Sequence, residues 1–426
     1  MKPSFDIQLK QHTPMIHFQF DQPGAALRAS DLKPRLDKFL GIDSKKTRYR
    51  LEVIPINEPK TVNNNEEFRN EPYFGNRGNP KKKFKIEYLN GVRLIINTPF
   101  QQEIGERIKA SLNEFFALES FGTRNNKGYG CFYPESATQA DFETALKSLH
   151  LAGKIGDIYY WDCDDKILFH SIALFNRWIK SGINIKPAYY KSILFCYADT
   201  EKGLIWDKRF VKEKFLTPPS LGSFGTKAEV WSNPPVKGKE YRFIRAMLGL
   251  STDNAWSSKN YKNYARKLSM NESHLVVSCA PGLSEPSKQL EVERIPNPFM
   301  YKVFRGGSSN RVYVFALKSL TSAKDETKGK IFNIHPELLG KDFEFGFIDG
   351  NKKNTLNKIE SLKTPDSLDY NDFLEYAEIQ IKNSTPQSGS SIPKNYNGNS
   401  TTAGQKAEFI AQHLRKNLKK LEVQNG

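Results

Sequence analysis

The sequence predicts an α+β protein made of two β-α-β-β-α-β units, a linker and a C-terminal helix. Three observations carry this prediction. Strand-like and helix-like periods alternate in that order along the first 140 residues. The chain has 426 residues, 38% of them hydrophobic, which is enough for sizeable cores. Residues 383–404 are rich in Ser, Asn, Gly and Pro, a composition typical of linkers.

The strands of the first unit are indicated by alternation of apolar and polar residues. Residues 4–11 and 47–56 alternate in this way, and each predicts a half-buried strand. Asn90 and Gly91 stand between two further alternating runs, as in a hairpin with a two-residue turn. Residues 131–135 predict a short last strand.

Two helices are expected between these strands. Residues 27–41 carry apolar side chains at helical spacing. Pro34 fits only the first turn of this helix, so Ser30 or Asp31 is the expected N-cap. Residues 101–120 show one apolar face over about five turns. The resulting β-α-β-β-α-β order is that of a ferredoxin-like unit, and also of an RNA-recognition motif.

The second half also reads as α+β, with less order visible. Residues 57–83 form a long polar insertion between the second and third strands. Helices are expected at 139–153 and 170–182, and a buried strand at 188–198. Residues 299–317 predict two strands around a Gly-Gly turn.

The predicted domain boundaries follow from these segments. The last helix is basic and amphipathic, and it could dock on its own chain, dock on a partner or stay loose. The expected parts are a ferredoxin-like domain with a glycine-rich loop at 1–140, a second ferredoxin-like α+β domain at 141–382, a flexible linker at 383–404 and a basic amphipathic tail helix at 405–426.

The charge of the chain indicates an anionic partner. Lys and Arg number 64 against 47 Asp and Glu, a net charge of +17. Nucleic acid is the first candidate and an anionic membrane surface the second, while a basic but inert surface is the plain alternative. No apolar run approaches the length of a membrane span, and the first residues lack the apolar core of a signal peptide. A cytoplasmic location without membrane contact is therefore expected.

The sequence offers no pattern for a metal or cofactor site, so none is expected. The four cysteines are far apart, and the seven histidines show no HExxH spacing. Neither GxSxG nor a Walker A pattern occurs. Asp162, Asp164 and Asp165 are close in sequence and could bind a divalent cation, but a solvated turn is the better interpretation.

The segment 121–130 is the principal candidate for anion binding. Gly122, Gly128 and Gly130 surround Arg124 and Lys127. Glycine allows the backbone to turn sharply or to approach a ligand closely. We therefore expect a loop that holds an RNA backbone, with the two cations neutralising phosphates; an ordinary polar loop is the alternative.

Further cations occur at predicted turns and helix starts. A helix N-terminus favours anions, and residues three apart share a helix face. Each of these cations could equally be a solvated surface charge. The additional candidate RNA contacts are Arg28, Lys33 and Arg35 in the first helix, Arg242 and Arg245 in a possible helix, and Arg305 before the Gly-Gly turn.

Two histidines near the first strand raise the possibility of RNA cleavage. His12 or His17 could move protons in a metal-independent reaction that uses the 2′-hydroxyl as nucleophile. That chemistry needs a second acid or base and a cation on the phosphate. A sheet-edge or base-stacking role is the favoured interpretation.

The combination of these segments resembles the RAMP superfamily of CRISPR-associated proteins. Residues 13–40 look like the opening of that family, a strand followed by a basic helix start. The matching positions are Arg28, Ser30, Leu32, Lys33 and Arg35, whereas Asp31 and Pro34 depart from the pattern. The glycine-rich segment is similar to the family's glycine loop through Gly122, Arg124, Lys127, Gly128 and Gly130.

This resemblance, most marked to the two-domain members at the guide 3′ end of Cmr-type (type III-B) effectors, carries several expectations. It implies a non-catalytic RNA-binding subunit in antiviral defence, with guide RNA, target RNA and other effector subunits as candidate partners. Some superfamily members cleave RNA, so a metal-independent endoribonuclease remains an alternative. Asp21 would be the loop aspartate of a target-cleaving member. A basic scaffold protein with protein partners alone is the third reading.

Overall fold

The computed structural model has a mixed α/β architecture built on antiparallel sheets, with seven α-helices among the residues it describes. The described residues are 5–16, 27–43, 49–58, 60–63, 84–87, 91–99, 101–185, 188–206, 240–249, 255–256, 275–278, 297–307, 309–317, 340, 342–348, 356–385 and 402–423.

The first sheet is four-stranded and antiparallel, in the order β2-β5-β1-β6. Its apolar side chains, such as Leu9, Leu51 and Leu94, pack against the first helices of the chain. Its strands are β1 (Phe5–Gln11), β2 (Arg50–Pro55), β5 (Val92–Asn97) and β6 (Phe132–Pro134). The helices beside it are α1 (Ala29–Leu40), α2 (Gln102–Leu118) and α3 (Gln139–Leu151).

Two further strands extend this sheet as a long hairpin. Strands β3 (Lys60–Asn63) and β4 (Phe84–Glu87) pair with each other in the same register that joins β2 to β5. The hairpin turn predicted at Asn90 and Gly91 is therefore wrong. Strand β4, before it, pairs with β3, and β5, after it, pairs with β2, so β4 and β5 follow one another along the same side of the long hairpin. Gly91 has φ +84, and a Cβ there would lie 1.8 Å from the carbonyl oxygen of Leu9.

Helix α1 begins earlier than the sequence indicated. Arg28 is its N-cap, with an extended backbone, so Pro34 lies inside the helix and not in its first turn. The amides of Asp31 and Leu32 donate to the Arg28 carbonyl at 3.1 and 3.2 Å. The expectation of Ser30 or Asp31 as N-cap is wrong, and the helix tolerates the hydrogen bond that Pro34 cannot donate.

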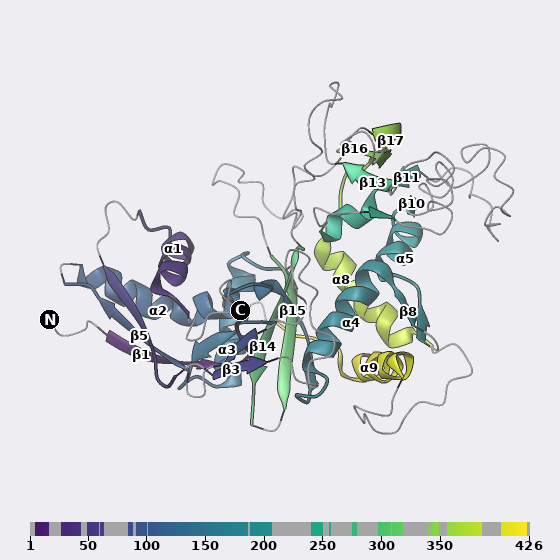
Figure 1. Cartoon of the computed structure of the whole chain (residues 1–426). Helices are drawn as coiled ribbons and strands as arrows, with labels where there is room; N and C mark the ends of the chain where they lie inside the picture. The colour runs from purple at the N-terminus through teal and green to yellow at the C-terminus, as the bar shows by residue number, and fades with distance from the viewer. Residues whose placement is uncertain are drawn as a thin grey trace, which may run out of the picture.

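A second four-stranded sheet has the order β14-β15-β7-β18 and forms the middle of the molecule (Figure 1). Arg305 pairs with Asn310, which confirms the hairpin predicted around Gly306 and Gly307. The strands are β7 (Tyr159–Cys163), β14 (Phe299–Arg305), β15 (Asn310–Ala316) and β18 (Lys419–Lys420). The helices packed beside it are α4 (Leu168–Ser181), α8 (Tyr370–Asn383) and α9 (Ala403–Asn417).

Both faces of the second sheet are buried. Alternate residues of β14 belong to different cores: Met300 and Phe304 pack with α2 and α3, whereas Phe299 and Val303 pack with α4, α8 and α9. A strand covered on both faces is expected to be apolar throughout, as β14 is except for Lys302 and its last residue, Arg305. The second sheet thus joins the two cores of the molecule.

The remaining elements lie around this frame. Ser192 is the N-cap of α5, so the buried strand predicted at 188–198 is wrong over most of its length. The short strands here are β8 (Ile183–Ile185), β9 (Ala188–Tyr190), β10 (Leu204–Trp206) and β11 (Glu240–Arg242). A third four-stranded sheet contains β12 (Ala255–Trp256), β13 (Leu275–Ser278), β16 (Asp342–Ile348) and β17 (Leu356–Lys363). The remaining helical segments are α5 (Ile193–Thr200) and the 3₁₀ helices η2 (Asn125–Lys127) and η3 (Ile244–Leu248).

Within the described ranges, no helix combines the length and the apolar character that a membrane crossing requires.

Candidate nucleic-acid interface

The glycine loop, defined here as residues 119–131, connects α2 to β6. Its backbone is fixed on the segment that follows β1: the amide of Thr123 donates to the Ile16 carbonyl at 2.7 Å, and that of Gly130 to the Pro14 carbonyl at 3.0 Å. The loop is therefore attached to the first sheet along its length, between its two ends in α2 and β6.

The glycines of the loop serve the packing of the protein itself. Gly122 and Gly130 have φ of +82 and +67, and an added Cβ would lie 2.5 Å from the Ile16 oxygen and 1.9 Å from the Phe121 oxygen, respectively. Gly128 has φ +79 and faces the side chain of Ile172. The close approach that glycine permits is here to the chain's own backbone and to α4.

Arg124 is the one non-glycine residue with positive φ among those the structure describes, at φ 58. It is the N-cap of η2 and is partly exposed. A residue other than glycine in this region costs about 1 kcal/mol or more. An arginine at a position that suits glycine points to a use for its side chain.

The side chain of Lys127 points away from the partly exposed turn that carries Arg124, and toward α4 and β14. Its Nζ donates to Oδ1 of Asn176 in α4 at 2.6 Å and lies 5.2 Å from the ring centre of Tyr301 in β14. Burial, together with the nearby charges of Lys180 and Arg124, lowers the pKa of Lys127 to about 7. The two cations of the loop therefore face different parts of the molecule.

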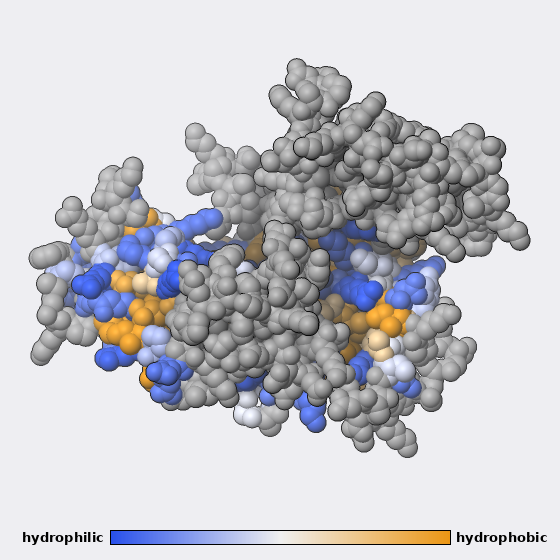
Figure 2. Space-filling model, viewed as in Figure 1, coloured by the Kyte–Doolittle hydropathy of each residue, from blue (hydrophilic) through white to orange (hydrophobic). Residues whose placement is uncertain are grey.

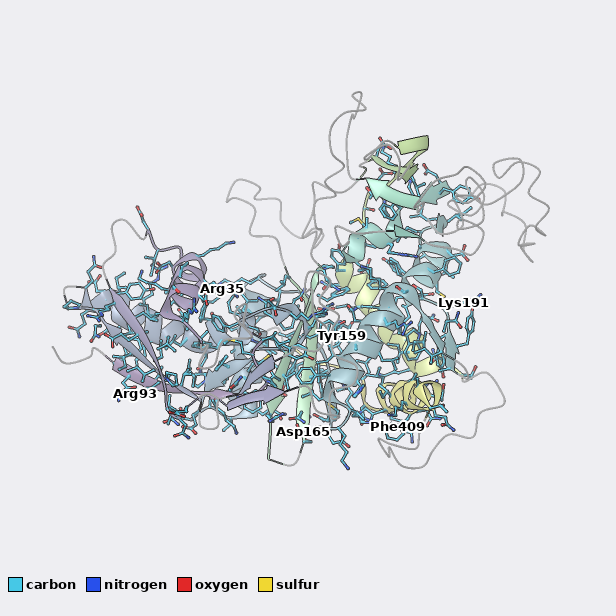
Figure 3. All side chains as sticks on the ribbon, viewed as in Figure 1. Arg35, Arg93, Tyr159, Asp165, Lys191 and Phe409 are labelled. Carbon is cyan, nitrogen blue, oxygen red and sulfur yellow. The ribbon has the colours of Figure 1, made fainter. Side chains whose placement is uncertain are left out.

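The first helix meets the start of the glycine loop. Arg35 of α1 pairs with Glu119 at 3.1 Å and donates to the Ser120 carbonyl at 2.8 Å (Figure 3). Lys33 pairs with Asp37 in the next turn of the same helix at 2.9 Å. Arg35 and Lys33 are thus engaged within the fold, while Arg28 and Ser30 are exposed at the start of α1.

Lys302 of β14 is a buried cation whose partners the sequence did not indicate. It is fully buried, and its Nζ donates to the Phe116 carbonyl at 2.8 Å, the Glu119 carbonyl at 2.5 Å and the Ser120 Oγ at 2.9 Å. These acceptors lie where α2 ends and the glycine loop begins. Lys302 therefore joins the second sheet to the loop of the first.

The RNA contacts predicted in the second half of the chain are Arg242, Arg245 and Arg305. They are far from the glycine loop in sequence, and each has partners within the protein. Arg242 is buried, with Glu240 at 2.8 Å and Asp366 at 3.0 Å, so its charge is used inside the fold. Arg245 lies partly buried in η3. Arg305 pairs with Asp165 at 3.0 Å, at the end of β14.

His12 is buried beside the end of β14. Its side chain is 2% exposed, its Nδ1 accepts from the Arg305 amide at 2.7 Å, and its ring lies 4.5 Å from that of Phe304. Burial, together with the charges of Lys10, Lys302 and Arg305, lowers the pKa of His12 to about 3. The other two catalytic candidates, His17 and Asp21, lie outside the described residues.

The aspartates at the end of β7 and directly after it, Asp162, Asp164 and Asp165, have protein partners. Asp162 binds Arg311 at 2.6 Å, and Oδ1 of Asp164 accepts from the Ile167 amide at 3.1 Å. No group of His, Cys, Asp or Glu side chains placed to hold a metal ion occurs in the part of the chain that the structure describes.

Comparison with known proteins matches most of the chain to one family. The model described as the Cmr1 N-terminal domain matches residues 2–50 and 42–183, and the model described as the Cmr1 C-terminal domain matches residues 189–398. A structural comparison finds the crystal structure of Cmr1 from Pyrococcus furiosus (apo form), with a TM-score of 0.33 and 13% identity, covering 77% of this chain and 91% of that one. No curated protein matches the chain. The two family models together span most of the sequence, so this chain belongs to the Cmr1 family of Cmr-type RAMP proteins.

Proposed function

We propose that this chain is a non-catalytic RNA-binding subunit of a type III-B CRISPR effector, holding guide RNA and contacting neighbouring subunits. Membership of the Cmr1 family supports the effector assignment. The net charge of +17 supports a polyanionic partner. A role as a scaffold with protein partners alone would leave this excess charge without a use.

The observation that carries the RNA part of the proposal is the conformation of Arg124. Hydrogen bonds to Pro14 and Ile16 hold the glycine loop in place, and Arg124 keeps its strained backbone on a partly exposed turn of that loop. A guanidinium presented from a rigid support can bind phosphate through two parallel hydrogen bonds. Arg28 and Ser30 at the start of α1 are further contacts in this proposal.

The arrangement of strands supports two ferredoxin-like units as part of this proposal. In the first sheet the second, third, first and fourth strands of the unit are neighbours, as β2-β5-β1-β6. The second sheet repeats that order as β14-β15-β7-β18, if β7 counts as the first strand and β18 as the last. On this reading α9 and β18 complete the second unit.

The surroundings of His12 favour binding over cleavage. A general acid or base for RNA cleavage must reach the substrate and must change its charge near neutral pH. His12 is buried, and a pKa of about 3 keeps it neutral. The endoribonuclease alternative would then depend on His17 or Asp21.

The proposal is tested by RNA binding at increasing salt, with the RNA examined for cleavage on a gel. The wild-type chain should bind single-stranded RNA, lose affinity as salt rises and leave the RNA intact. Arg124→Ala should bind more weakly, and its log–log salt slope should be smaller by about 0.7 for one lost phosphate contact. Arg50→Ala is the matched control, because the Arg50 side chain is 79% exposed on β2, where its ion pair with Glu52 at 2.9 Å is also exposed to solvent.

Each outcome decides a different part of the proposal. Failure of the wild-type chain to bind RNA would overturn it and favour the scaffold reading. Shortened RNA would favour the endoribonuclease. Equal losses in Arg124→Ala and Arg50→Ala would leave the glycine loop without a special part in binding.

A further inference from the structure

The exposed side of α8 is acidic, although the chain as a whole carries a net charge of +17. Asp372 and Glu375 are exposed three residues apart, and Glu378 follows at the same spacing. Glu378 pairs with Lys382 at 2.6 Å. Asp372 and Glu375 have no ion pair with any other residue that the structure describes. This part of α8 therefore has the opposite charge to the protein as a whole.

Carboxylates from neighbouring segments extend this surface on both sides of α8. Asp157 lies beside the first turn of the helix, where its amide donates to Oδ1 of Asn371 at 2.9 Å. Partial burial, together with the charges of carboxylates such as Asp369, raises the pKa of Asp372, and Lys202 partly offsets this. We call this surface the acidic face, and its members are Asp157, Glu201, Asp369, Asp372, Glu375 and Glu378.

Two buried tyrosines next to the acidic face have hydroxyl groups without a partner. Tyr197 of α5 is 2% exposed and packs its ring on Phe373 and Tyr376 of α8, and Tyr159 of β7 is 1% exposed. Neither hydroxyl has a hydrogen-bond partner within the described ranges. Burial, and then the carboxylates of the acidic face, raise the pKa of both phenols. Buried polar groups are normally hydrogen-bonded, so these two hydroxyls indicate that a donor from outside the chain belongs at this surface.

An apolar side chain lies within the acidic face. Ile379 is 48% exposed, and its spacing from Asp372 and Glu375 puts all three on one side of α8. Lys and Arg side chains combine an apolar stem with a cationic head. Their stems could cover Ile379 while their heads pair with the carboxylates around it. RNA phosphates, by contrast, would be repelled by the same carboxylates.

We propose that the acidic face is a docking surface for a Lys- and Arg-rich segment of a protein partner. Charge complementarity carries this assignment, because exposed carboxylates without ion pairs and unpartnered phenol oxygens all accept hydrogen bonds from cationic donors. In the proposed function the partner is a neighbouring effector subunit. The inference rests on that part of the proposed function, and not on RNA binding.

The test measures binding of fluorescently labelled decalysine to the full chain by anisotropy, at about 0.1 M salt, where the Debye length is about 10 Å. A chain with a net charge of +17 repels this peptide overall, so binding requires a local acidic site. The wild-type chain should bind, and Asp372→Asn/Glu375→Gln should bind on the order of fivefold more weakly. Amide hydrogen exchange in α8 should slow when decalysine is bound.

Two further variants show whether charge at this position is what matters. Glu103→Gln/Glu106→Gln is the matched control, because both glutamates are exposed on α2 with the same three-residue spacing. It should bind decalysine like the wild-type chain. Asp372→Glu/Glu375→Asp keeps both charges and should also bind like the wild type.

Each of the other results would overturn the docking surface. No binding of decalysine by the wild-type chain, or equal losses in the Asp372→Asn/Glu375→Gln and Glu103→Gln/Glu106→Gln variants, would do so and leave the proposed RNA binding standing. A lower RNA affinity of Asp372→Asn/Glu375→Gln would place RNA, and not a protein, on α8. Self-association of the wild-type chain in sedimentation velocity, lost in that variant, would make a second copy of the chain the occupant.

Failure of the proposed RNA binding would be recognised separately. A wild-type chain that binds decalysine at α8 but no RNA would overturn the RNA part of the proposed function and support the docking surface.

Discussion

Lys302 shows how one buried charge can connect two parts of a protein. Its ammonium lies at the C-terminal end of α2, where the helix dipole favours a cation and where backbone carbonyls lack partners inside the helix. Desolvation lowers the pKa of Lys302, and the three acceptors offset the cost of burying its charge. The start of the glycine loop is thereby held on the second sheet.

We expect Lys302→Met to destabilise the protein by about 3 kcal/mol, because it leaves buried acceptors at Phe116, Glu119 and Ser120 without a donor. Urea unfolding measures the difference. Lys382→Met is the control, since Lys382 pairs with Glu378 on the exposed side of α8 and should contribute less than about 0.5 kcal/mol. Equal losses in the two variants would contradict this account of Lys302.

The candidate site was only partly predictable at the scale of residues. The glycine-rich spacing indicated the loop, but not its contact with α1, which Arg35 makes. The direction of Lys127 was not predictable, because it depends on α4, 49 residues further along the chain. Lys302 did leave a signal: it is the one charge in the apolar run 299–304, and a buried charge requires a partner.

Helix α9 shows what the sequence leaves open at the scale of elements. Its amphipathic pattern fits docking on the chain or on a partner equally well. In the structure Ala407, Ile410, Ala411 and Leu414 are buried against α4 and α8, and β18 pairs with β7 directly after the helix. Thr402 caps its first turn through a capping box with Gln405. The helix is thus part of the second core.

We expect Leu414→Ala to cost about 3 kcal/mol of folding stability, since the side chain is fully buried. Leu151→Ala, on α3, serves as the matched control because Leu151 is 59% exposed; its effect should lie within about 0.5 kcal/mol. Thermal and urea unfolding of both variants compare the two sites. A stable Leu414→Ala variant would mean that α9 is not docked in solution.

Local sequence patterns predicted most helices and strands. They failed where the pairing or packing partner determines which element forms. Periodicity gave β1, α2 and the hairpin of β14 and β15 correctly. It failed at Asn90 and Gly91, because a turn signal does not show whether β4 pairs with β5 or, as in the structure, with β3. It failed again at 188–198, where an apolar run fits a strand or a buried helix, and where Ser192 was the missed N-cap.

At the scale of the whole molecule, the second sheet is the shared element. It packs α2 and α3 on one face and α4, α8 and α9 on the other, and the glycine loop lies beside it (Figure 1). The glycine loop, which carries the proposed RNA contact at Arg124, therefore lies where the two parts of the molecule meet. Binding at this junction would depend on both halves of the chain.

A competing surface lies on the part of the molecule that contains the first sheet. Figure 2 shows hydrophobic and hydrophilic areas side by side there. Ile54 and Ile56 are 43% and 36% exposed on and after β2, and Arg93 pairs with Asp6 across β5 and β1. RNA-recognition motifs bind RNA on the face of such a sheet. The position of the RNA therefore distinguishes the two surfaces.

The central claim is tested most directly by ultraviolet cross-linking of bound single-stranded RNA, followed by mass spectrometry of the cross-linked peptides. The proposed RNA contact at the glycine loop predicts cross-links in residues 119–131, and their loss in an Arg124→Ala/Lys127→Met variant. Cross-links confined to β1, β2 and β5, unchanged in that variant, would contradict it and place the RNA on the face of the first sheet.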